Sequence, residues 1–260
     1  MGIEAGRIGL RVLAAVVLAF LFARLTAAQS PGRNLVSLRG QQAEIYYYPA
    51  TGQRLNRKVL FAPGDGGWRG WAITIAQQMA SWGYDVYGID TKTYLESFTG
   101  KTTLSENDVM ADFRNLALWM TRNSGERVTL VGWSEGAGLS VLAASSPENK
   151  RVFNGLITFG LGDENILGWN WKDSLTYITK TKPNQPVFHV SGYMSKIASL
   201  PYLMIQSSND EFVPFDEARN LATLAREPKR VVVIPANNHR FDGNQNEFFR
   251  SLREGLQWMK

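Results

Sequence analysis

Short runs of apolar, β-branched residues alternate with longer stretches of helical apolar spacing along most of this chain. The short runs predict strands at residues 43–48, 59–62, 86–89, 127–131, 155–159, 203–205 and 231–234. Apolar positions three and four residues apart predict helices at residues 71–82, 105–122, 135–144, 216–225 and 246–259. Ser105 suits the N-cap of the second helix, with Asp108 at its third position. Strands that alternate with helices predict an α/β fold, in which a mostly parallel central sheet is covered by helices on both faces.

Residues 161–199 fit no strand–helix unit, although several aromatic residues lie among them: Trp169, Trp171, Tyr177 and Tyr193. A long irregular segment within a compact domain is commonly functional. We therefore expect an insertion over the carboxyl edge of the sheet. No linker or shift in composition marks a second domain, so the sequence predicts a single domain over residues 29–260.

The beginning of the chain, residues 1–28, has the pattern of a secretory signal peptide. Two arginines precede the twelve apolar residues at 12–23, and Arg24 and the small residues 26–28 follow. The apolar run is shorter than the ~20 residues that span a bilayer, so we expect cleavage after Ala28. The alternative is an uncleaved N-terminal anchor. In both cases we expect an exported domain, located in the periplasm.

Composition limits the chemistry that this chain can perform. Its 260 residues are 44% apolar and include 13 Phe, 9 Tyr and 8 Trp, enough for one substantial core. The absence of cysteine excludes disulfides, thiolate metal sites and a cysteine nucleophile, and two histidines are too few for a histidine-rich metal site. We therefore expect no metal and no cofactor. A histidine base must be His189 or His239, and we expect His189 to be structural or to face the substrate.

Charge adds little to the choice of partner. The formal net charge of +5 falls to +3 when residues 1–28 are removed, because three Arg and one Glu leave with them. The sequence contains no run of five basic residues and no nucleic-acid-binding motif, so nucleic acid is not an expected partner. The mild positive charge allows a transient contact with an anionic membrane surface.

One motif points to a specific chemistry. Residues 132–136 read Gly-Trp-Ser-Glu-Gly and lie between a predicted strand and a predicted helix. In this context G-x-S-x-G places the serine at the tip of a strained turn, and the glycines remove Cβ atoms where helix and strand pass closely. Ser134 is therefore the predicted nucleophile, and the backbone N–H of Glu135 is the first predicted oxyanion donor. The alternative is a packing turn without a catalytic role.

The partners of such a serine follow it in the order acid, then histidine. Asp210 comes just after the predicted strand at 203–205, and His239 comes just after the predicted strand at 231–234. We predict that His239 is the general base and that Asp210 holds its imidazole in the working tautomer. Three other acids remain as alternatives to Asp210: Glu211, Asp163 and Glu164.

A glycine-rich turn supplies the second predicted oxyanion donor. Residues 63–68, Pro-Gly-Asp-Gly-Gly-Trp, follow the predicted strand at 59–62, where this architecture places that donor. The N–H of Asp65 or of Gly66 is the expected group. A phosphate-binding loop is disfavoured, because the Lys-Ser/Thr of a P-loop and the G-x-G-x-x-G spacing are both missing.

Asp65 and Glu135 would place two carboxylates beside this oxyanion hole. Negative charge opposes the transition state there unless it faces a cation, and the ammonium group of an aminoacyl ester is such a cation. The alternative is that both side chains point to solvent or to Arg69.

Separated segments of the chain resemble a known fold and, more narrowly, a known family. The motif at 132–137 with the ordered Asp210 and His239 resembles the α/β-hydrolase fold. The sequences GDGGW and HRFDG, at 64–68 and 239–243, resemble the family of the bacterial virulence protein VirJ, which includes the carboxyl-terminal domain of AcvB.

A third segment extends this likeness. Asp90, followed by YLESF at 94–98, is similar to the stretch after the next strand in the VirJ family, and the likeness covers about residues 58–258. The resemblance implies a periplasmic protein that hydrolyses aminoacyl-phosphatidylglycerol, chiefly the lysyl form.

The expected function is therefore an exported serine hydrolase that cleaves a small-molecule or lipid ester through an acyl-enzyme. The expected substrate contacts are Asp65, Glu135, Trp68 and Tyr94. Two alternatives remain: a general carboxylesterase or peptidase of the same fold, and a non-catalytic VirJ-like binding protein associated with secretion or virulence.

Overall fold

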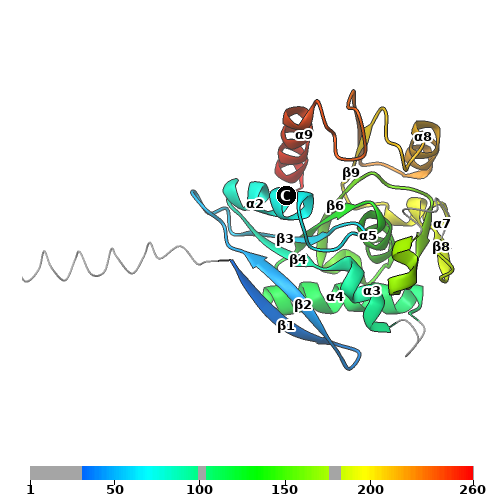
Figure 1. The fold of residues 1–260 in the computed structure, drawn as a ribbon. Coiled ribbons are helices and arrows are strands. Elements are labelled where there is room, and N and C mark those ends of the chain that lie inside the picture. The colour runs from blue at the N-terminus through cyan, green and yellow to red at the C-terminus, as the bar shows by residue number, and fades with distance from the viewer. Residues whose placement is uncertain (1–30, 99–103, 176–182, 260) are drawn as a thin grey trace, which may run out of the picture. The chain divides into compact units, whose positions relative to one another are not determined.

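The predicted strands pair into one central sheet (Figure 1). This computed structural model describes residues 31–98, 104–175 and 183–259. Within them the sheet has eight strands in the order β1-β2-β4-β3-β5-β6-β9-β10. Their bounds are β1 (Gly32–Leu38), β2 (Gln41–Tyr48), β3 (Arg57–Ala62), β4 (Tyr84–Ile89), β5 (Val128–Trp133), β6 (Phe153–Phe159), β9 (Tyr202–Ser207) and β10 (Lys229–Ile234). β2 is antiparallel to both of its neighbours and every other pair is parallel, so the sheet is mostly parallel, as predicted.

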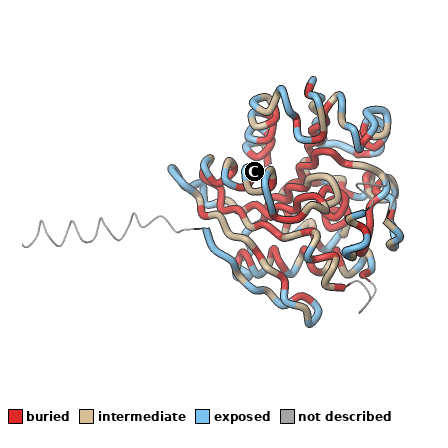
Figure 2. Tube along the Cα trace, in the orientation of Figure 1, coloured by how far each residue is buried: buried red, intermediate tan, exposed pale blue. Residues whose placement is uncertain are grey.

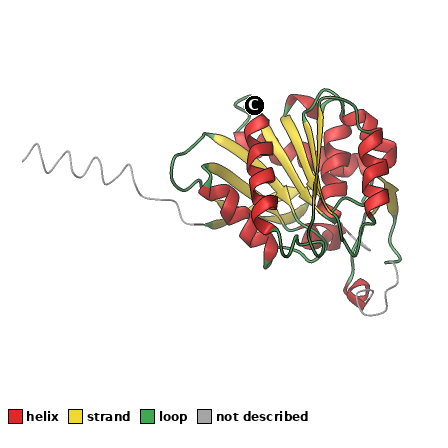
Figure 3. Cartoon of the chain, turned by 90° about the horizontal axis from the view of Figure 1, so that it is seen from above, coloured by secondary structure: helices red, strands yellow, loops and turns green. Residues whose placement is uncertain are grey.

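Helices cover both faces of the sheet, as Figure 3 shows from above. The helices are α2 (Trp71–Ser81), α3 (Thr91–Phe98), α4 (Glu106–Thr121), α5 (Glu135–Ser145), α8 (Phe215–Leu224) and α9 (Gln245–Trp258), and a short turn η1 (Asn149–Arg151) precedes β6. α2 and α9 pack in one apolar cluster with Phe61 and Val131, whereas α4 and α5 pack in the other with Leu60 and Leu130. Neighbouring residues of a strand point to opposite faces, and because both faces are covered the strands carry continuous apolar runs. Buried positions accordingly concentrate in the sheet (Figure 2).

Two elements outside the predicted set extend the fold. β1 has few apolar residues and owes its place to a tight hairpin with β2, in which Arg39 and Gly40 have φ of 46° and 80°. Two successive residues with positive φ are typical of two-residue β-hairpin turns. α3 is only eight residues long, and the side chain of Asp90 accepts a hydrogen bond from the N–H of Thr93 in its first turn (3.0 Å). Both elements depend on local contacts that apolar periodicity does not show.

The irregular segment 161–199 contains a small hairpin and short helical turns. They are β7 (Glu164–Ile166), η2 (Trp171–Leu175), β8 (Val187–His189), α7 (Ser191–Met194) and η3 (Ser195–Ile197), with β7 antiparallel to β8. Asn165 is buried against α5, where a Cβ on Gly138 would lie 2.1 Å from its Oδ1. Its side-chain amide donates to the carbonyl of Gly162 (2.9 Å). The hairpin is therefore fixed to the helix that begins at Ser134.

The residues from Pro31 to Lys260 form one compact unit. The predicted signal peptide at 1–28 and Tyr177 lie outside the described residues. Among the residues that are described, no helix is both long and apolar enough to cross a membrane.

The predicted catalytic residues, the glycine-rich turn and Asp90 all follow strands of the sheet. The glycine-rich turn at 63–68 follows β3, Asp90 follows β4, Ser134 follows β5, Asp210 follows β9 and His239 follows β10. Because parallel strands end at the same edge of a sheet, these groups lie along one edge, where open α/β sheets bind their ligands.

Candidate active site

Ser134 forms a sharp turn between β5 and α5. Its φ of 54° and ψ of −124° lie in a region that L-residues rarely occupy, which costs about 1–3 kcal/mol. Its N–H donates to the carbonyl of Phe159 (3.0 Å) and its carbonyl accepts from Ala137 (2.8 Å), so β6 and α5 hold the turn. A Cβ on Gly132 would lie 2.6 Å from the Cα of Ala137, and one on Gly136 would lie 2.1 Å from a backbone oxygen at the end of β3. Close packing therefore requires both glycines of the motif.

His239 and Asp210 form a buried hydrogen-bonded pair. Nδ1 of His239 lies 2.7 Å from Oδ2 of Asp210, and the two side chains are only 6% and 1% exposed. The other carboxylate oxygen accepts from the N–H groups of Phe212 (2.9 Å) and Val213 (3.0 Å). Burial alone would raise the pKa of Asp210, but the hydrogen bond and charge of His239, with the two N–H groups, lower it below its ordinary value. The carboxylate is therefore held in its ionised form.

The structure gives the alternative acids other places. Glu211 is exposed, and its Oε2 accepts the backbone N–H of His239 (2.7 Å) rather than the imidazole. Asp163 lies beside the other histidine, with its Oδ2 3.3 Å from Nδ1 of His189. Of the acids considered, Asp210 is the one that meets the ring of His239, while Glu211 braces the backbone beneath it.

The imidazole of His239 lies against the turn that follows β6. A Cβ on Gly160, whose φ is 59°, would lie 2.3 Å from Cε1 of His239. The ring lies 5.6 Å from that of Trp133, the residue before Ser134, and 5.3 Å from the edge-on ring of Phe212 (centroid distances). Within the described residues Nε2 of His239 has no hydrogen-bond partner. The need for Gly160 was not predicted, and its signal in the sequence is a glycine directly after a strand.

The glycine-rich turn approaches the serine closely. A Cβ on Gly64 would lie 3.1 Å from the Cβ of Ser134, and the turn is closed by the N–H of Gly67, which donates to the carbonyl of Gly64 (3.0 Å). In the described part of the chain, neither the N–H of Gly66 nor that of Glu135 donates a recorded hydrogen bond. These two N–H groups therefore remain candidate oxyanion donors.

Comparison with known proteins gives a partial family match and shows the fold. Residues 56–152 match the family described as bacterial virulence protein (VirJ). Over that stretch the chain is similar to the VirJ family. An uncharacterized protein of Mycobacterium tuberculosis strain H37Rv is 27% identical over 216 residues, which cover 80% of this chain and 72% of that protein.

Two solved structures show the same fold at low sequence identity. The α/β hydrolase GrgF from Penicillium has a TM-score of 0.67 at 12% identity and covers 89% of this chain and 99% of its own. A membrane phospholipase A described as a bacterial virulence factor has a TM-score of 0.62 at 16% identity and covers 98% of this chain and 97% of its own. At these identities the likeness establishes the fold.

Acidic side chains gather around the first residue of α5, next to Ser134. Glu135 accepts the N–H of Ile166 through Oε1 (2.7 Å), which ties the first residue of α5 to β7. Burial raises the pKa of Glu135 well above its ordinary value, the charges of Asp65 and Glu164 raise it further, and the bond from Ile166 opposes the shift. The charges of Asp65 and Glu164 are therefore close enough to Glu135 to act on its pKa, while the prediction that Asp65 and Glu135 lie beside an oxyanion hole stays a prediction.

Two expected substrate contacts have other roles in the structure. Tyr94 is 2% exposed and its hydroxyl donates to the buried Asp112 (2.8 Å), so it belongs to the core between α3 and α4. Trp68 is 8% exposed, stacks on Tyr46 with ring centroids 4.9 Å apart, and directs its indole N–H to the hydroxyl of Tyr48 (3.4 Å). These contacts correct the expectation, because both rings are committed to protein neighbours.

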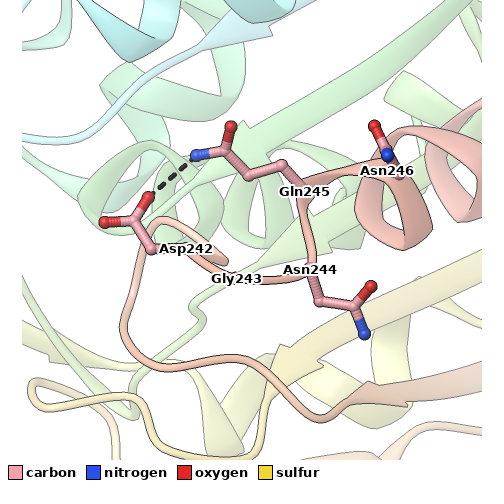
Figure 4. A pocket seen from close by; sticks show the side chains of 5 residues that line it. All are labelled: Asp242, Gly243, Asn244, Gln245 and Asn246. Carbon is pink, nitrogen blue, oxygen red and sulfur yellow. Dashed lines mark hydrogen bonds between the residues drawn. The ribbon is translucent and has the colours of Figure 1, made fainter.

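The loop that follows His239 borders a hollow of about 370 Å³ (Figure 4). It is lined by Asp242, Gly243, Asn244, Gln245 and Asn246. Asp242 accepts from the side-chain amides of Gln245 (2.8 Å) and Asn238 (2.7 Å), which closes the loop on itself. The hollow is lined by none of the predicted catalytic side chains. The hydrogen bonds of Asp242 brace the loop that carries His239. In the described ranges there is also no group of three His, Asp or Glu residues that could hold a metal ion.

Proposed function

We propose that this protein is a serine hydrolase in which Ser134 is the nucleophile, His239 the general base and Asp210 the acid that orients it. The observation that supports it most strongly is the buried 2.7 Å bond between His239 and Asp210. Among the described residues, Nε2 of this imidazole has no hydrogen-bond partner. An imidazole oriented by a carboxylate, at the same sheet edge as a serine on a strained turn, supplies the components that activate a hydroxyl.

The proposed reaction is acyl transfer to water. Nε2 of His239 takes the proton of the Ser134 hydroxyl as Oγ attacks the ester carbonyl, and the N–H groups of Glu135 and the glycine-rich turn stabilise the oxyanion. The tetrahedral intermediate collapses, the C–O bond to the alcohol breaks, and His239 returns the proton to the leaving oxygen. Water then attacks the acyl-enzyme in the same way and releases the acid.

The proposed substrate is an aminoacyl ester of a lipid headgroup, such as lysyl-phosphatidylglycerol. Burial is the main cause of the raised pKa of Glu135, and the charges of Asp65 and Glu164 raise it further, so these two carboxylates create a negative potential around the first residue of α5. The ammonium group of an aminoacyl ester would relieve that potential, whereas a plain acyl chain would not. The solved structure described as a membrane phospholipase A gives further support to a lipid ester.

We also propose that the domain acts outside the cytoplasm, in the periplasm, with transient contact at the membrane surface. The support is the signal-like pattern of the first 28 residues. Mass spectrometry of the protein from a periplasmic fraction is expected to find a chain that begins at Gln29. A chain that begins at Met1 and stays with the membrane fraction would indicate the uncleaved anchor instead.

Release of lysine from lysyl-phosphatidylglycerol vesicles tests the reaction and the substrate together. We expect the wild type to release lysine and Ser134→Ala to lose about 10⁴-fold or more of the rate. Hydrolysis of p-nitrophenyl butyrate or a peptide ester, but not of the aminoacyl lipid, would indicate a general carboxylesterase or peptidase. Failure of the wild type to hydrolyse any of these and to react with a fluorophosphonate would indicate a non-catalytic binding protein.

The contribution of the acidic groups is tested separately. Glu135→Gln and Asp65→Asn are expected to lower kcat/KM for an aminoacyl ester about tenfold relative to the matching ester without the amino group. Equal losses on both esters would show that the carboxylates do not recognise the ammonium group.

A further inference from the structure

Asp90 lies between the glycine-rich turn and α3, at the carboxyl end of β4. Its Oδ2 accepts the backbone N–H of Trp68 (3.0 Å), and its Oδ1 accepts the N–H of Thr93 (3.0 Å). Its backbone carbonyl also accepts the N–H of Tyr94 (2.8 Å). One carboxylate therefore joins Trp68, the last residue of the glycine-rich turn, to the first turn of α3.

The turn also rests directly on this carboxylate. A Cβ on Gly67 would lie 2.9 Å from Oδ1 and 3.2 Å from Oδ2 of Asp90, and Gly67 has a φ of 77°. Glycine is thus required here both by the backbone conformation and by the close approach of the carboxylate. A movement of Asp90 would therefore displace Gly67, the residue that follows the proposed donor Gly66.

The ring of Trp68 fixes the same end of the turn from the other side. A Cβ on Gly88 of β4 would lie 1.8 Å from Cη2 of Trp68, so the indole occupies the space that a side chain would fill. Gly88 and Asp90 stand two residues apart on one chain, and they hold the ring and the backbone N–H of Trp68 respectively. At the opposite end, Gly64 packs on Ser134. The backbone of Asp65 and Gly66, which carries the proposed oxyanion donors, therefore lies between two fixed contacts: Gly64 with Ser134, and Gly67 with Asp90.

We propose that Asp90 is a positioning residue for the oxyanion hole, acting through the backbone of residues 64–68. The proposal rests on the proposed hydrolase function. Oxyanion donors act only within about 2.7–3.1 Å of the developing charge, and a displacement near 1 Å costs on the order of 10²-fold in rate. The negative charge of Asp90 is stabilised by the N–H groups of Trp68 and Thr93 and by the N-terminus of α3.

Two substitutions of Asp90 remove its hydrogen bonds to Trp68 and Thr93 to different extents. Asp90→Asn keeps one acceptor oxygen, so it can serve Trp68 or Thr93 but not both, whereas Asp90→Ala serves neither. Ser105→Ala is a matched control, because Ser105 caps α4 through a similar bond, to the N–H of Asp108 (3.2 Å), in an element that carries none of the site residues. Asp90→Ala and Ser105→Ala both lose a helix cap, and only the substitutions at Asp90 weaken the contact with the glycine-rich turn.

The kinetic readout separates positioning from stability. With p-nitrophenyl butyrate we expect kcat to fall about 10-fold in Asp90→Asn and about 10²-fold in Asp90→Ala, with KM changed less than about threefold. A trifluoromethyl ketone, which adds Ser134 Oγ to form an oxyanion, should bind more weakly by the same factor. Ser105→Ala should keep the wild-type kcat although its melting temperature falls. Wild-type kcat in both Asp90 variants would overturn the proposal.

Hydrogen exchange of the full chain provides a readout that does not need activity. Amides of the peptide spanning residues 64–69 should exchange about tenfold faster in Asp90→Asn than in the wild type, while peptides of α5 remain unchanged. Unchanged exchange over residues 64–69 would overturn the proposal. If the wild type neither turns over esters nor reacts with a fluorophosphonate, the proposed function fails, and the exchange result still decides whether Asp90 holds the turn.

Discussion

Ser134 keeps a side chain in a backbone conformation that glycine adopts far more readily, with φ of 54° and ψ of −124°. We predict that Ser134→Gly is more stable than Ser134→Ala by about 1 kcal/mol, because glycine relieves the strain and alanine keeps a Cβ. Both variants lack the hydroxyl, so their difference reports the strain and not the chemistry. Urea unfolding at pH 7 gives the comparison. Equal stabilities would show that this turn stores no strain.

Asp210 and Glu211 are neighbours in the chain, but we expect their substitution to lower kcat by very different factors. Asp210→Asn should lower kcat about 10⁴-fold, because the amide cannot hold the imidazole in the working tautomer or stabilise its charge. Glu211→Gln should lower kcat by about tenfold at most, since an amide oxygen can still accept the backbone N–H of His239. Ester hydrolysis measured side by side, with Ser134→Ala as the baseline, compares them. A larger loss at Glu211 would reverse the assignment of the acid.

Residue identities in the site were more predictable than their bonds. The types and order of Ser134, Asp210 and His239 follow from the chemistry, and the fold brings them to one edge of the sheet. The bond from the N–H of Ile166 to Glu135 has no signal in the sequence, because it depends on how a distant insertion folds. Tyr94 was misplaced for the same reason, since its partner Asp112 is on another helix.

At the scale of elements, the β7–β8 hairpin is locked to α5 by one close contact. Gly138 leaves room for the buried side chain of Asn165, and a Cβ there would lie 2.1 Å from its Oδ1. We predict that Gly138→Ala lowers the free energy of unfolding by about 1–3 kcal/mol, because the hairpin must move away. In an Asn165→Ala background the same change should cost less than about 1 kcal/mol, since the methyl group then has space and alanine favours helix.

A double-mutant cycle by urea unfolding measures this coupling. The wild type, both single variants and the double variant are compared at one pH. Additive effects would show that Gly138 and Asn165 do not constrain each other, and that the hairpin is held by its other contacts.

Elements with a strong local signal were predicted closely. Ser105 caps α4 as expected, and its side chain and that of Asp108 accept each other's backbone N–H groups (3.2 and 2.9 Å). Seven strands and five helices came from apolar periodicity, with differences of a few residues at their ends. Periodicity did not predict three elements, namely β1, α3 and the hairpin within 161–199. Short elements held by turns, caps and tertiary contacts leave little periodic pattern.

At the scale of the whole molecule, Glu135 links stability to pH. Its pKa in the folded chain lies well above the ordinary value of 4.5, so folding favours the protonated form. Below pH 4.5 both folded and unfolded chains are protonated there and this contribution to stability is fully present. It is lost as the pH rises through the folded-state pKa, because the folded chain must then ionise a buried group.

Glu135→Gln removes this dependence while keeping an oxygen that can accept the N–H of Ile166. The melting temperature of the variant relative to the wild type should therefore increase as the pH is raised above 4.5, and level off once Glu135 is ionised. Melting curves from pH 4.5 to 8.5 show the trend. A difference that stays constant across this range would contradict the raised pKa.

The strain at Ser134 also has a consequence for how sequences of this kind drift. Serine codons of the AGC and AGT type become glycine codons by one base change, and glycine is the residue that this turn accommodates most easily. A gene copy released from selection for catalysis would gain stability by that single step, so mutation and folding would both carry the position toward glycine. Retention of serine at this position in related sequences would therefore indicate selection for its hydroxyl group.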